Sequence, residues 1–459
     1  MTLPPQVLSP LDGRYHAVVS PLGEYLSEAG LNRARVTVEV EWLIYLTNHS
    51  MFGSSPLSAG DVAALRALVT DFGQAEIDEL ARLEATTRHD VKAVEYLVRA
   101  KLSELGLDKI AELTHFACTS EDINNLSYAL IVRDAVADVW LPALTAVISR
   151  LRELALQYRD IPMLAKTHGQ PATPTTMGKE IAVFVYRLER IKKQVESTEY
   201  LGKFSGATGT FAAHLAADPS ANWPTISEEF VSSLGLTWNP LTTQIESHDW
   251  QAELYTRVSH ANRVLHNLAT DIWTYISMGY FRQIPQAGAT GSSTMPHKIN
   301  PIRFENAEAN LELSCAVLDS LSATLVTSRL QRDLTDSTTQ RNVGVGLGHS
   351  LLALDNIRRG LSEIDLDEAA LAYDLDTNWE ILGEAIQTVI RAEVTAGRST
   401  ISDPYALLKE LTRGKRINRD DLVAFVSKLE IGDDAKARLL ELTPAGYAGI
   451  ASELVDYLK

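Results

Sequence analysis

The chain has 459 residues, of which 45% are hydrophobic and 22% charged, the balance of an ordinary globular protein with roughly three domains. Its formal net charge of −17 disfavours nucleic acid and anionic membrane surfaces as partners, because both are bound through a basic face. A small anionic substrate remains compatible with this charge wherever cationic side chains are concentrated locally.

No stretch reaches the roughly 18 uninterrupted apolar residues of a membrane span, and Met1 to Pro5 lack the basic patch and apolar core of a secretory signal. The two cysteines, Cys118 and Cys315, are too few for a disulfide framework and form no CxxC metal pair. We therefore expect a reduced, cytoplasmic location, with both cysteines acting as small buried apolar residues.

Helical periodicity dominates the chain. Long amphipathic patterns predict helices at 125–158, 176–202, 250–281, 304–327 and 345–364. Several of these patterns exceed about 25 residues, which predicts an all-α fold with a bundle of extended helices. Strand signals are confined to fragments such as 237–239.

Two changes of pattern predict three domains. A helical N-terminal domain, 1–113, gives way at a polar segment to a central domain of long helices, 114–364. A small helical C-terminal domain, 365–459, follows, in which the helices are shorter. They are interrupted by Gly and Pro residues at four positions, Pro404, Gly414, Gly432 and Pro444.

Five polar segments interrupt the helical pattern, and they lie at 86–90, 119–125, 166–174, 288–301 and 329–341. Capping boxes that open a helix are predicted at Thr87, Thr119 and Ser337. Such boxes usually only cap helices; the functional alternative is that their free backbone N–H groups face a polyanion. His89 would then lie in the first turn of its helix as a neutral ring, able to orient a substrate.

The third and fourth polar segments carry the candidate catalytic groups. His168 lies in a Gly- and Pro-rich turn before an amphipathic helix, a position that suits a catalytic and a structural histidine equally well. In the fourth segment, Lys298 supplies a cation beside the hydroxyls of Ser292 and Ser293, and Asn300 with Pro301 is expected to start a helix.

Two other classes of nucleotide enzyme are disfavoured. No Gly-x-x-x-x-Gly-Lys-Ser/Thr motif occurs, and the glycines at 344, 346 and 348 lack the spacing of a dinucleotide-binding loop. Hydrolysis of nucleoside triphosphates and hydride transfer are therefore not expected.

The segment Gly-Ser-Ser-Thr-Met-Pro-His-Lys-Ile-Asn-Pro at 291–301 resembles the signature of the fumarase/aspartase superfamily, whose members release or hydrate fumarate. Within that superfamily, the chain is similar nearly end to end to the adenylosuccinate lyase family in its longer bacterial form. The segments that carry this similarity are 9–15, 89–96, 115–125, 167–174, 331–337 and 410–416. Arg88 stands where close relatives of this form often have Asn.

The resemblance implies three helical domains and a homotetramer whose central domains form one bundle, with active sites shared between subunits. It implies elimination of fumarate from two small anionic nucleotides, adenylosuccinate and succinylaminoimidazole carboxamide ribotide, in purine biosynthesis. It implies no metal and no organic cofactor.

The resemblance also assigns roles to individual residues. Ser292 is the general base and His168 the general acid, while His89 orients the substrate and Lys298 stabilises charge. The succinyl carboxylate is bound by Thr119, Ser120, Lys298 and Asn300. The phosphate and ribose are bound by Arg14, Tyr15, Arg332, Ser337 and Arg341. The pocket is completed by Gln244 and Asn306, and further substrate contacts come from Arg88, Asp90, Ser293, Ile299, Thr338, Thr339 and Gln340.

Two alternatives remain open at this point. One is a different fumarate-releasing lyase of the superfamily, such as an argininosuccinate lyase or an aspartase, against which the nucleotide-binding matches at both ends of the chain argue. The other is a catalytically silent structural relative, which the intact His168, Ser292 and Lys298 argue against.

Overall fold

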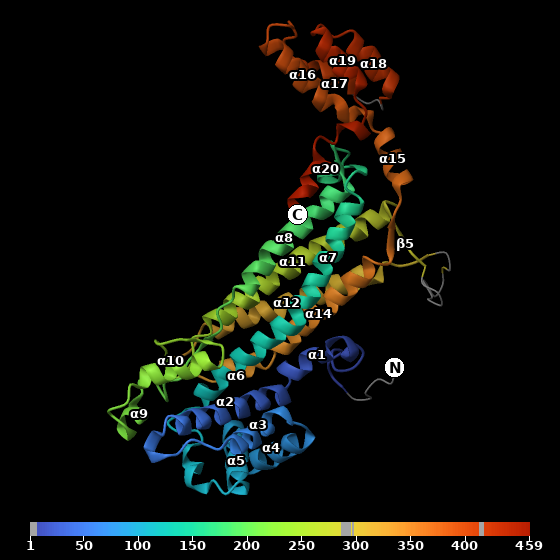
Figure 1. Cartoon of the computed structure of the whole chain (residues 1–459). Coiled ribbons are helices and arrows are strands. Elements are labelled where there is room, and N and C mark those ends of the chain that lie inside the picture. The colour runs from blue at the N-terminus through green and yellow to red at the C-terminus, as the bar shows by residue number, and fades with distance from the viewer. Residues whose placement is uncertain (1–6, 286–294, 296–297, 413–416) are drawn as a thin grey trace. The chain divides into compact units, whose positions relative to one another are not determined.

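The computed structural model describes residues 7–285, 295, 298–412 and 417–459, and helices make up most of them (Figure 1). Strands in the described residues are short, two or three residues each, and they form two-stranded pairs only. The predicted all-α fold is confirmed. None of the described helices combines the length and the apolar composition that crossing a membrane requires.

The chain forms two compact units, each assembled from three stretches of sequence. Unit 1 comprises Met1–Thr145, Ile191–Arg263 and Ala309–Asp355; unit 2 comprises Ala146–Arg190, Val264–Glu308 and Asn356–Lys459. Five long helices contribute residues to both units: α7 (Leu141–Gln157), α8 (Met177–Glu196), α11 (Asp249–Ser277), α12 (Ile302–Leu325) and α14 (Val343–Gly360). The division into three domains at residues 113 and 364 stays a prediction.

The N-terminal part of unit 1 is built around α2 (Glu28–Asn48), which packs against α3 (Ala59–Thr70), α5 (Asp90–Glu104) and α6 (Ser120–Ala135). Its apolar core includes Val36, Val40 and Leu43 of α2, with Leu97 and Val98 of α5. Besides the long helices shared with unit 2, the other α-helices of unit 1 are α1 (His16–Leu26), α4 (Gln74–Thr87), α9 (Ala212–Ala217), α10 (Trp223–Ser233) and α13 (Thr335–Gln340). Its strands are the parallel pair β3 (Leu201–Gly202) and β4 (Thr237–Trp238).

Unit 2 contains two antiparallel pairs, β1 (Pro162–Leu164) with β2 (Pro174–Thr176), and β5 (Phe281–Gln283) with β6 (Ile364–Leu366). A separate apolar core joins Leu164 of β1 to Leu375 and to the helices that follow. The α-helices from residue 368 onward are α15 (Glu368–Asp376), which carries Leu375, then α16 (Gly383–Thr395), α17 (Pro404–Thr412), α18 (Arg419–Ser427), α19 (Asp433–Glu441) and α20 (Ala451–Leu454).

All five predicted long helices are present, with shifted ends. The pattern at 125–158 is continuous helix through α6 and α7, joined by a π-helical turn at Val136–Trp140. The pattern at 345–364 ends earlier, at Gly360, because the chain then enters β6. The strand expected near 237–239 is β4.

The predicted helix starts have different outcomes. At Thr119 the Asp122 carboxylate accepts a hydrogen bond from the Thr119 N–H at 2.8 Å, as the box predicts. The boxes at Thr87 and Ser337 are wrong. His89 caps α5 in place of Thr87, and α13 starts at Thr335, whose N–H donates to Asp333 at 2.8 Å.

Candidate active site

Arg88, His89 and Asp90 occupy the junction between α4 and α5. Arg88 ends α4 with a φ of +52°, in the left-handed region that favours Gly and Asn. His89 is the N-cap of α5, where its Nδ1 accepts from the Lys92 N–H at 3.3 Å. A ring that accepts at Nδ1 is neutral and carries its proton on Nε2, and this nitrogen lies 3.5 Å from Ser120 Oγ. His89 and Ser120, two candidate residues from separate polar segments, are therefore in contact.

The start of α6, which carries Thr119 and Ser120, is anchored by a buried ion pair. The Asp122 carboxylate lies 2.8 Å from Lys203 Nζ, and both side chains are almost fully buried. Asp122 also accepts from the backbone N–H of Ser205 at 2.8 Å and from that of Thr119. This anchoring holds the first turn of α6 in place while Ser120 stays partly exposed.

Arg332 and Gln244 are brought into contact, as a shared pocket requires. Arg332 Nη1 donates to Gln244 Oε1 at 3.3 Å, and Arg332 Nη2 donates to Glu121 Oε1 at 2.9 Å. The Glu121 side chain is only 4% exposed. The Arg332 Nε is buried without a partner among the described residues. The Glu121 carboxylate therefore already accepts from one of the Arg332 nitrogens that are predicted to bind the nucleotide.

Arg341 is likewise held by acidic groups. Its Nη1 donates to the Ser337 carbonyl at 2.9 Å and Oγ at 3.0 Å, and its Nη2 donates to Asp90 Oδ2 at 3.2 Å. Burial by itself raises the pKa of the Asp90 carboxyl. The Arg35 guanidinium, the Val91 N–H and Arg341 outweigh burial and hold that pKa below its usual range. Asp90 is therefore a carboxylate at neutral pH and a permanent partner for cations.

The other candidates in unit 1 differ in accessibility. The Arg14 guanidinium lies over the Tyr15 ring, 5.9 Å from its centroid, just before α1. Thr338 is exposed on α13, and the Thr339 hydroxyl donates to the Thr335 carbonyl. Gln340 is buried and donates to Gln251 Oε1 at 3.1 Å, so its side chain is already used inside the protein.

In unit 2, His168 lies on the loop that joins β1 to β2. The loop is closed by a hydrogen bond from the Ala172 N–H to the Ala165 carbonyl at 2.9 Å, and His168 itself has a φ of +54°. Beside it, Lys166 Nζ forms an ion pair with Asp374 at 2.6 Å. The His168 side chain is exposed. The backbone is therefore fixed on both sides while the ring is open to solvent.

Glycine is required where this hairpin meets the following helix. A Cβ at Gly178, the second residue of α8, would lie 2.3 Å from the Ala155 carbonyl oxygen of α7. The Gly178 N–H donates to the Tyr158 carbonyl at 2.9 Å. This close approach sets the course of the chain that leaves β2.

Of the fourth polar segment, 288–301, the structure describes residues 295 and 298–301. Lys298 and Ile299 are exposed, and the Lys298 N–H donates to the Met295 carbonyl at 3.1 Å. Helix α12 starts at Ile302, one residue later than predicted. Pro301 therefore immediately precedes the helix instead of being its first residue, and its carbonyl accepts from the Phe304 N–H at 3.0 Å. Asn306 accepts from Asn356 at 3.0 Å. Ser292 and Ser293 lie outside the described residues.

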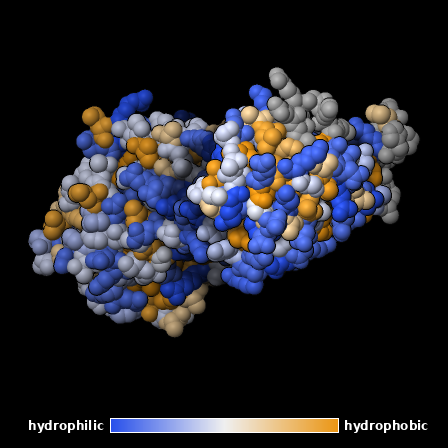
Figure 2. All heavy atoms as spheres, turned by 90° about the horizontal axis from the view of Figure 1, so that it is seen from above, coloured by the Kyte–Doolittle hydropathy of each residue, from blue (hydrophilic) through white to orange (hydrophobic). Residues whose placement is uncertain are grey.

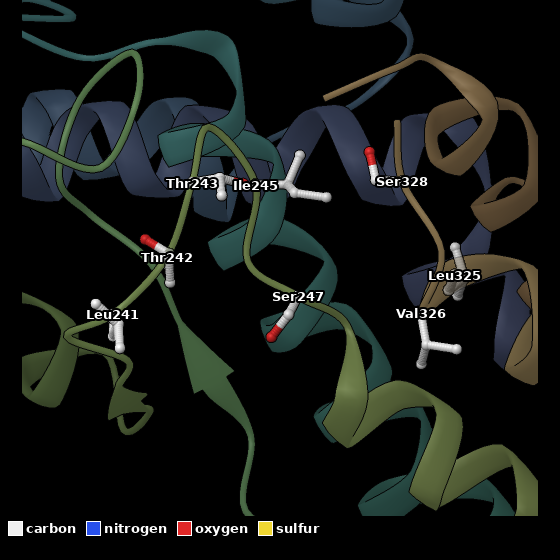
Figure 3. A pocket seen from close by; sticks show the side chains of 8 residues that line it. All are labelled: Leu241, Thr242, Thr243, Ile245, Ser247, Leu325, Val326 and Ser328. Atoms are coloured by element: carbon white, nitrogen blue, oxygen red, sulfur yellow. The ribbon is translucent and has the colours of Figure 1, made fainter. Parts of the chain in front are cut away.

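A pocket of about 340 Å³ lies next to the segment that carries Gln244, between residues 241–247 and 325–328 (Figure 3). Four apolar side chains and four hydroxyls line it, those of Leu241, Ile245, Leu325, Val326, Thr242, Thr243, Ser247 and Ser328. It contains no titratable side chain and none of the predicted catalytic residues. The pocket therefore flanks the candidate site without supplying its chemistry.

Sequence reasoning missed three polar residues that join the candidates of unit 1: Arg35, Glu121 and Asn124. Arg35 is 1% exposed and contacts Asp90 and Asn124. A signal was present, since Arg35 and Glu39 are opposite charges four residues apart in a stretch that is otherwise largely apolar.

Comparisons with known proteins cover nearly the whole chain. The family model described as Lyase matches residues 13–317, and the model described as Adenylosuccinate lyase C-terminal matches residues 328–448. The chain is 49% identical over 454 residues to the adenylosuccinate lyases of Escherichia coli (strain K12) and Haemophilus influenzae, with 98% of each chain covered. It is 44% identical over 450 residues to that of Legionella pneumophila (strain Corby), covering 98% of this chain and 97% of the relative.

Solved structures share the fold at much lower identity. A 3-carboxy-cis,cis-muconate lactonizing enzyme from Pseudomonas putida matches with a TM-score of 0.73 and 20% identity, covering 95% of this chain and 96% of its own. A fumarate lyase from Mesorhizobium sp. BNC1 matches with a TM-score of 0.74 and 18% identity, covering 96% and 97%. At these identities the likeness establishes the architecture alone.

Proposed function

The chain belongs to the adenylosuccinate lyase family, and we propose that it eliminates fumarate from adenylosuccinate to give AMP. We propose the same reaction on succinylaminoimidazole carboxamide ribotide, which makes the protein a carbon–nitrogen lyase of purine nucleotide biosynthesis. The observation that carries this proposal is the 49% identity to adenylosuccinate lyases over 98% of the chain.

The elimination moves one proton off carbon and one onto nitrogen. Ser292, as an alkoxide, removes the proton from the succinyl carbon next to a carboxylate, and the electron pair is delocalised into that carboxylate. The carbon–nitrogen bond then breaks, and His168 protonates the departing amino nitrogen. The reaction is redox-neutral, and side chains move both protons in this scheme, so we propose that it proceeds without a metal or an organic cofactor.

The developing negative charge requires donors and cations around the succinyl end. Lys298 is proposed to stabilise the Ser292 alkoxide and the carbanion, together with backbone N–H groups. Thr119, Ser120 and Asn300 are proposed to bind the carboxylate. The contact between Ser120 and the neutral His89 ring supports a role for His89 in orienting this end of the substrate.

The nucleotide end is proposed to bind to the arginine groups of unit 1. A guanidinium presents a planar fork of donors that matches phosphate, so Arg332 and Arg341 suit this role. Arg14, Tyr15 and Ser337 would complete the phosphate and ribose contacts. The hydrogen bond between Arg332 and Gln244 supports a common pocket for these residues.

We propose a cytoplasmic homotetramer in which active sites combine residues of different subunits. Large apolar side chains on the long helices support association: Tyr186 on α8, Trp273 on α11 and Leu313 on α12 are all exposed. Figure 2 shows hydrophobic residues interspersed among hydrophilic ones on the face seen there. Exposed aromatic and apolar side chains of this kind are enriched at interfaces.

Fumarate release from the two substrates tests the activity directly. We expect the purified protein to produce fumarate and AMP from adenylosuccinate, and fumarate from the succinylated ribotide. Ser292→Ala should lower kcat about 100-fold or more, whereas the matched Ser293→Ala should lose far less. Equal losses in both variants would reject Ser292 as the base, and no fumarate from either substrate would reject the function.

Mixing two inactive variants tests the shared site. Hybrid tetramers of His168→Gln and Ser292→Ala contain some sites in which both catalytic residues are intact, if those residues come from different subunits. Reassembly of the two dissociated variants should then restore turnover. Hybrids that form, as native mass spectrometry would show, but stay inactive would place both residues in one subunit.

A further inference from the structure

Arg35 is a cation buried inside unit 1 with no assigned role. It lies on α2 and is 1% exposed. Its Nε donates to Asn124 Oδ1 at 2.9 Å, its Nη1 to Asn32 Oδ1 at 2.8 Å, and its Nη2 to Asp90 Oδ2 at 2.8 Å. Burying a guanidinium is costly unless its donors are satisfied, and here each nitrogen of the fork has an acceptor.

Through these acceptors Arg35 is connected to both of the arginines that we propose bind the nucleotide. On one side, Asp90 Oδ2 also accepts from Arg341 Nη2 at 3.2 Å. On the other side, Asn124 Nδ2 donates to Glu121 Oε1 at 2.9 Å, and the same oxygen accepts from Arg332 Nη2 at 2.9 Å. One continuous series of hydrogen bonds thus joins Arg341 to Arg332, with Arg35 at its centre.

The position of Arg35 has an electrostatic consequence for Arg341. Asp90 shares one carboxylate oxygen between two guanidinium groups, and its contact with Arg35 is the shorter of the two. Without Arg35, the whole charge of Asp90 would act on Arg341 and compete with an incoming phosphate for the same donors. With Arg35 in place, part of that charge is already neutralised.

We propose that Arg35 is a positioning residue of the nucleotide site, which holds Asp90 and Asn124 so that Arg341 and Arg332 keep a fixed spacing and Arg341 stays available to the substrate's phosphate. This inference rests on the proposed function. It differs from a merely structural role, because a structural role would affect folding and turnover without regard to the phosphate.

The test compares Arg35→Gln and Arg35→Lys with wild type in the full-length protein. The substrates are adenylosuccinate and its 5′-dephosphorylated nucleoside. We expect KM for the nucleotide to rise about tenfold in Arg35→Gln, with kcat within about twofold and little change in KM for the nucleoside. Arg35→Lys should be intermediate, because an ammonium keeps the charge but cannot present the fork to Asp90 and Asn124 together.

Arg33→Gln is the matched control. Arg33 lies two residues earlier on α2, is partly exposed, and donates to the Glu24 carbonyl at 2.6 Å, away from the series of hydrogen bonds. Its kinetic constants should match those of wild type. If Arg35→Gln does not fold, as thermal unfolding would reveal, Asn124→Leu breaks only the side that leads to Arg332 and should again raise KM for the nucleotide selectively.

The outcomes separate this inference from the function on which it rests. Wild-type protein that releases no fumarate rejects the function itself. If the wild-type protein is active, two results in the Arg35 variants would reject the positioning role and leave the function intact. One is an equal change in KM for the nucleotide and the nucleoside, and the other is a fall in kcat alone.

Discussion

The candidate groups of unit 1 and those of unit 2 are held in opposite ways. In unit 1, Arg332 and Arg341 are bound by Glu121 and Asp90, which are in turn fixed by the buried Arg35 and its partner Asn124. In unit 2, the His168 ring is exposed, and no hydrogen bond to it is found in the part of the chain that the structure describes. Only the backbone of its loop is fixed, by the β1–β2 pair.

This difference follows from what each group has to do. A residue that binds an anion gains affinity when its charge is already oriented, so buried partners help it. A general acid has to reach the atom that it protonates, so its ring must stay accessible while its backbone is aimed. We therefore expect substitutions in unit 1 to affect stability and binding, and substitution of His168 to affect turnover alone.

The largest expected effect is on the buried ion pair of unit 1. Lys203→Met leaves the fully buried Asp122 carboxylate without its cation and should lower the free energy of unfolding by about 3–5 kcal/mol. Lys192→Met is the control: it removes the partly exposed ion pair with Glu196 and should cost about 0.5 kcal/mol or less. Urea unfolding measures both, and equal losses would contradict the special status of the buried pair.

The comparison predicts the reverse pattern for His168. His168→Gln should lower kcat about 100-fold or more, while the melting temperature and the affinity for adenylosuccinate stay close to wild type. Gln170→Ala, in the same exposed loop, should retain activity. Isothermal titration that shows no substrate binding by folded His168→Gln would instead make His168 a binding residue.

A smaller effect concerns the pH dependence of stability in unit 1. His115 Nδ1 lies 2.6 Å from Glu39 Oε1; burial lowers the pKa of His115, but the hydrogen bond and charge of Glu39 raise it above its usual value overall. A raised folded-state pKa stabilises the fold fully below the unfolded value of about 6.5, and this stabilisation is lost as pH rises through the folded-state pKa.

Glu39→Gln tests this relation, because it keeps an acceptor for the His115 N–H but removes the charge. As pH rises through the folded-state pKa of His115, the free energy of unfolding of the wild-type protein should fall, and the variant should lack that fall. The change should be smaller than that of Lys203→Met. Urea unfolding at a series of pH values measures it, and parallel curves for the two proteins would rule out the His115–Glu39 pair as the cause.

The smallest effect is expected at Arg88, which adopts a left-handed backbone conformation at the end of α4. Arg88→Asn should raise the free energy of unfolding by about 0.5 kcal/mol, because Asn tolerates this conformation better. Arg82→Asn, in the interior of α4, should lower it, since Asn is a poorer helix former than Arg. Thermal unfolding that shows the same sign for both would contradict the backbone explanation.

The sequence by itself determined the all-α class, the long helices and the polar segments in which most of the candidate residues lie; Arg14, Tyr15, Gln244 and Asn306 lie outside those segments and were assigned by resemblance. These features depend on hydrophobic periodicity and on motifs of a few neighbouring residues, and both can be read directly from one sequence. The capping predictions show the limit of such local rules. The capping box predicted at Thr119 is present. At α5, the His89 ring caps the helix instead of Thr87. At α13, the helix starts at Thr335, whose N–H donates to the Asp333 side chain, and not after Ser337.

Only the tertiary structure decided which charges pair. Arg35 meets Asp90 and Asn124 across separations of 55 and 89 residues, and Arg332 meets Glu121 across 211. No local pattern specifies such partners, because the energy of a buried ion pair depends on distance, burial and the remaining acceptors around it. The sequence indicated where the chemistry is concentrated, and the packing of α2, α5 and α6 determined how its cations are held.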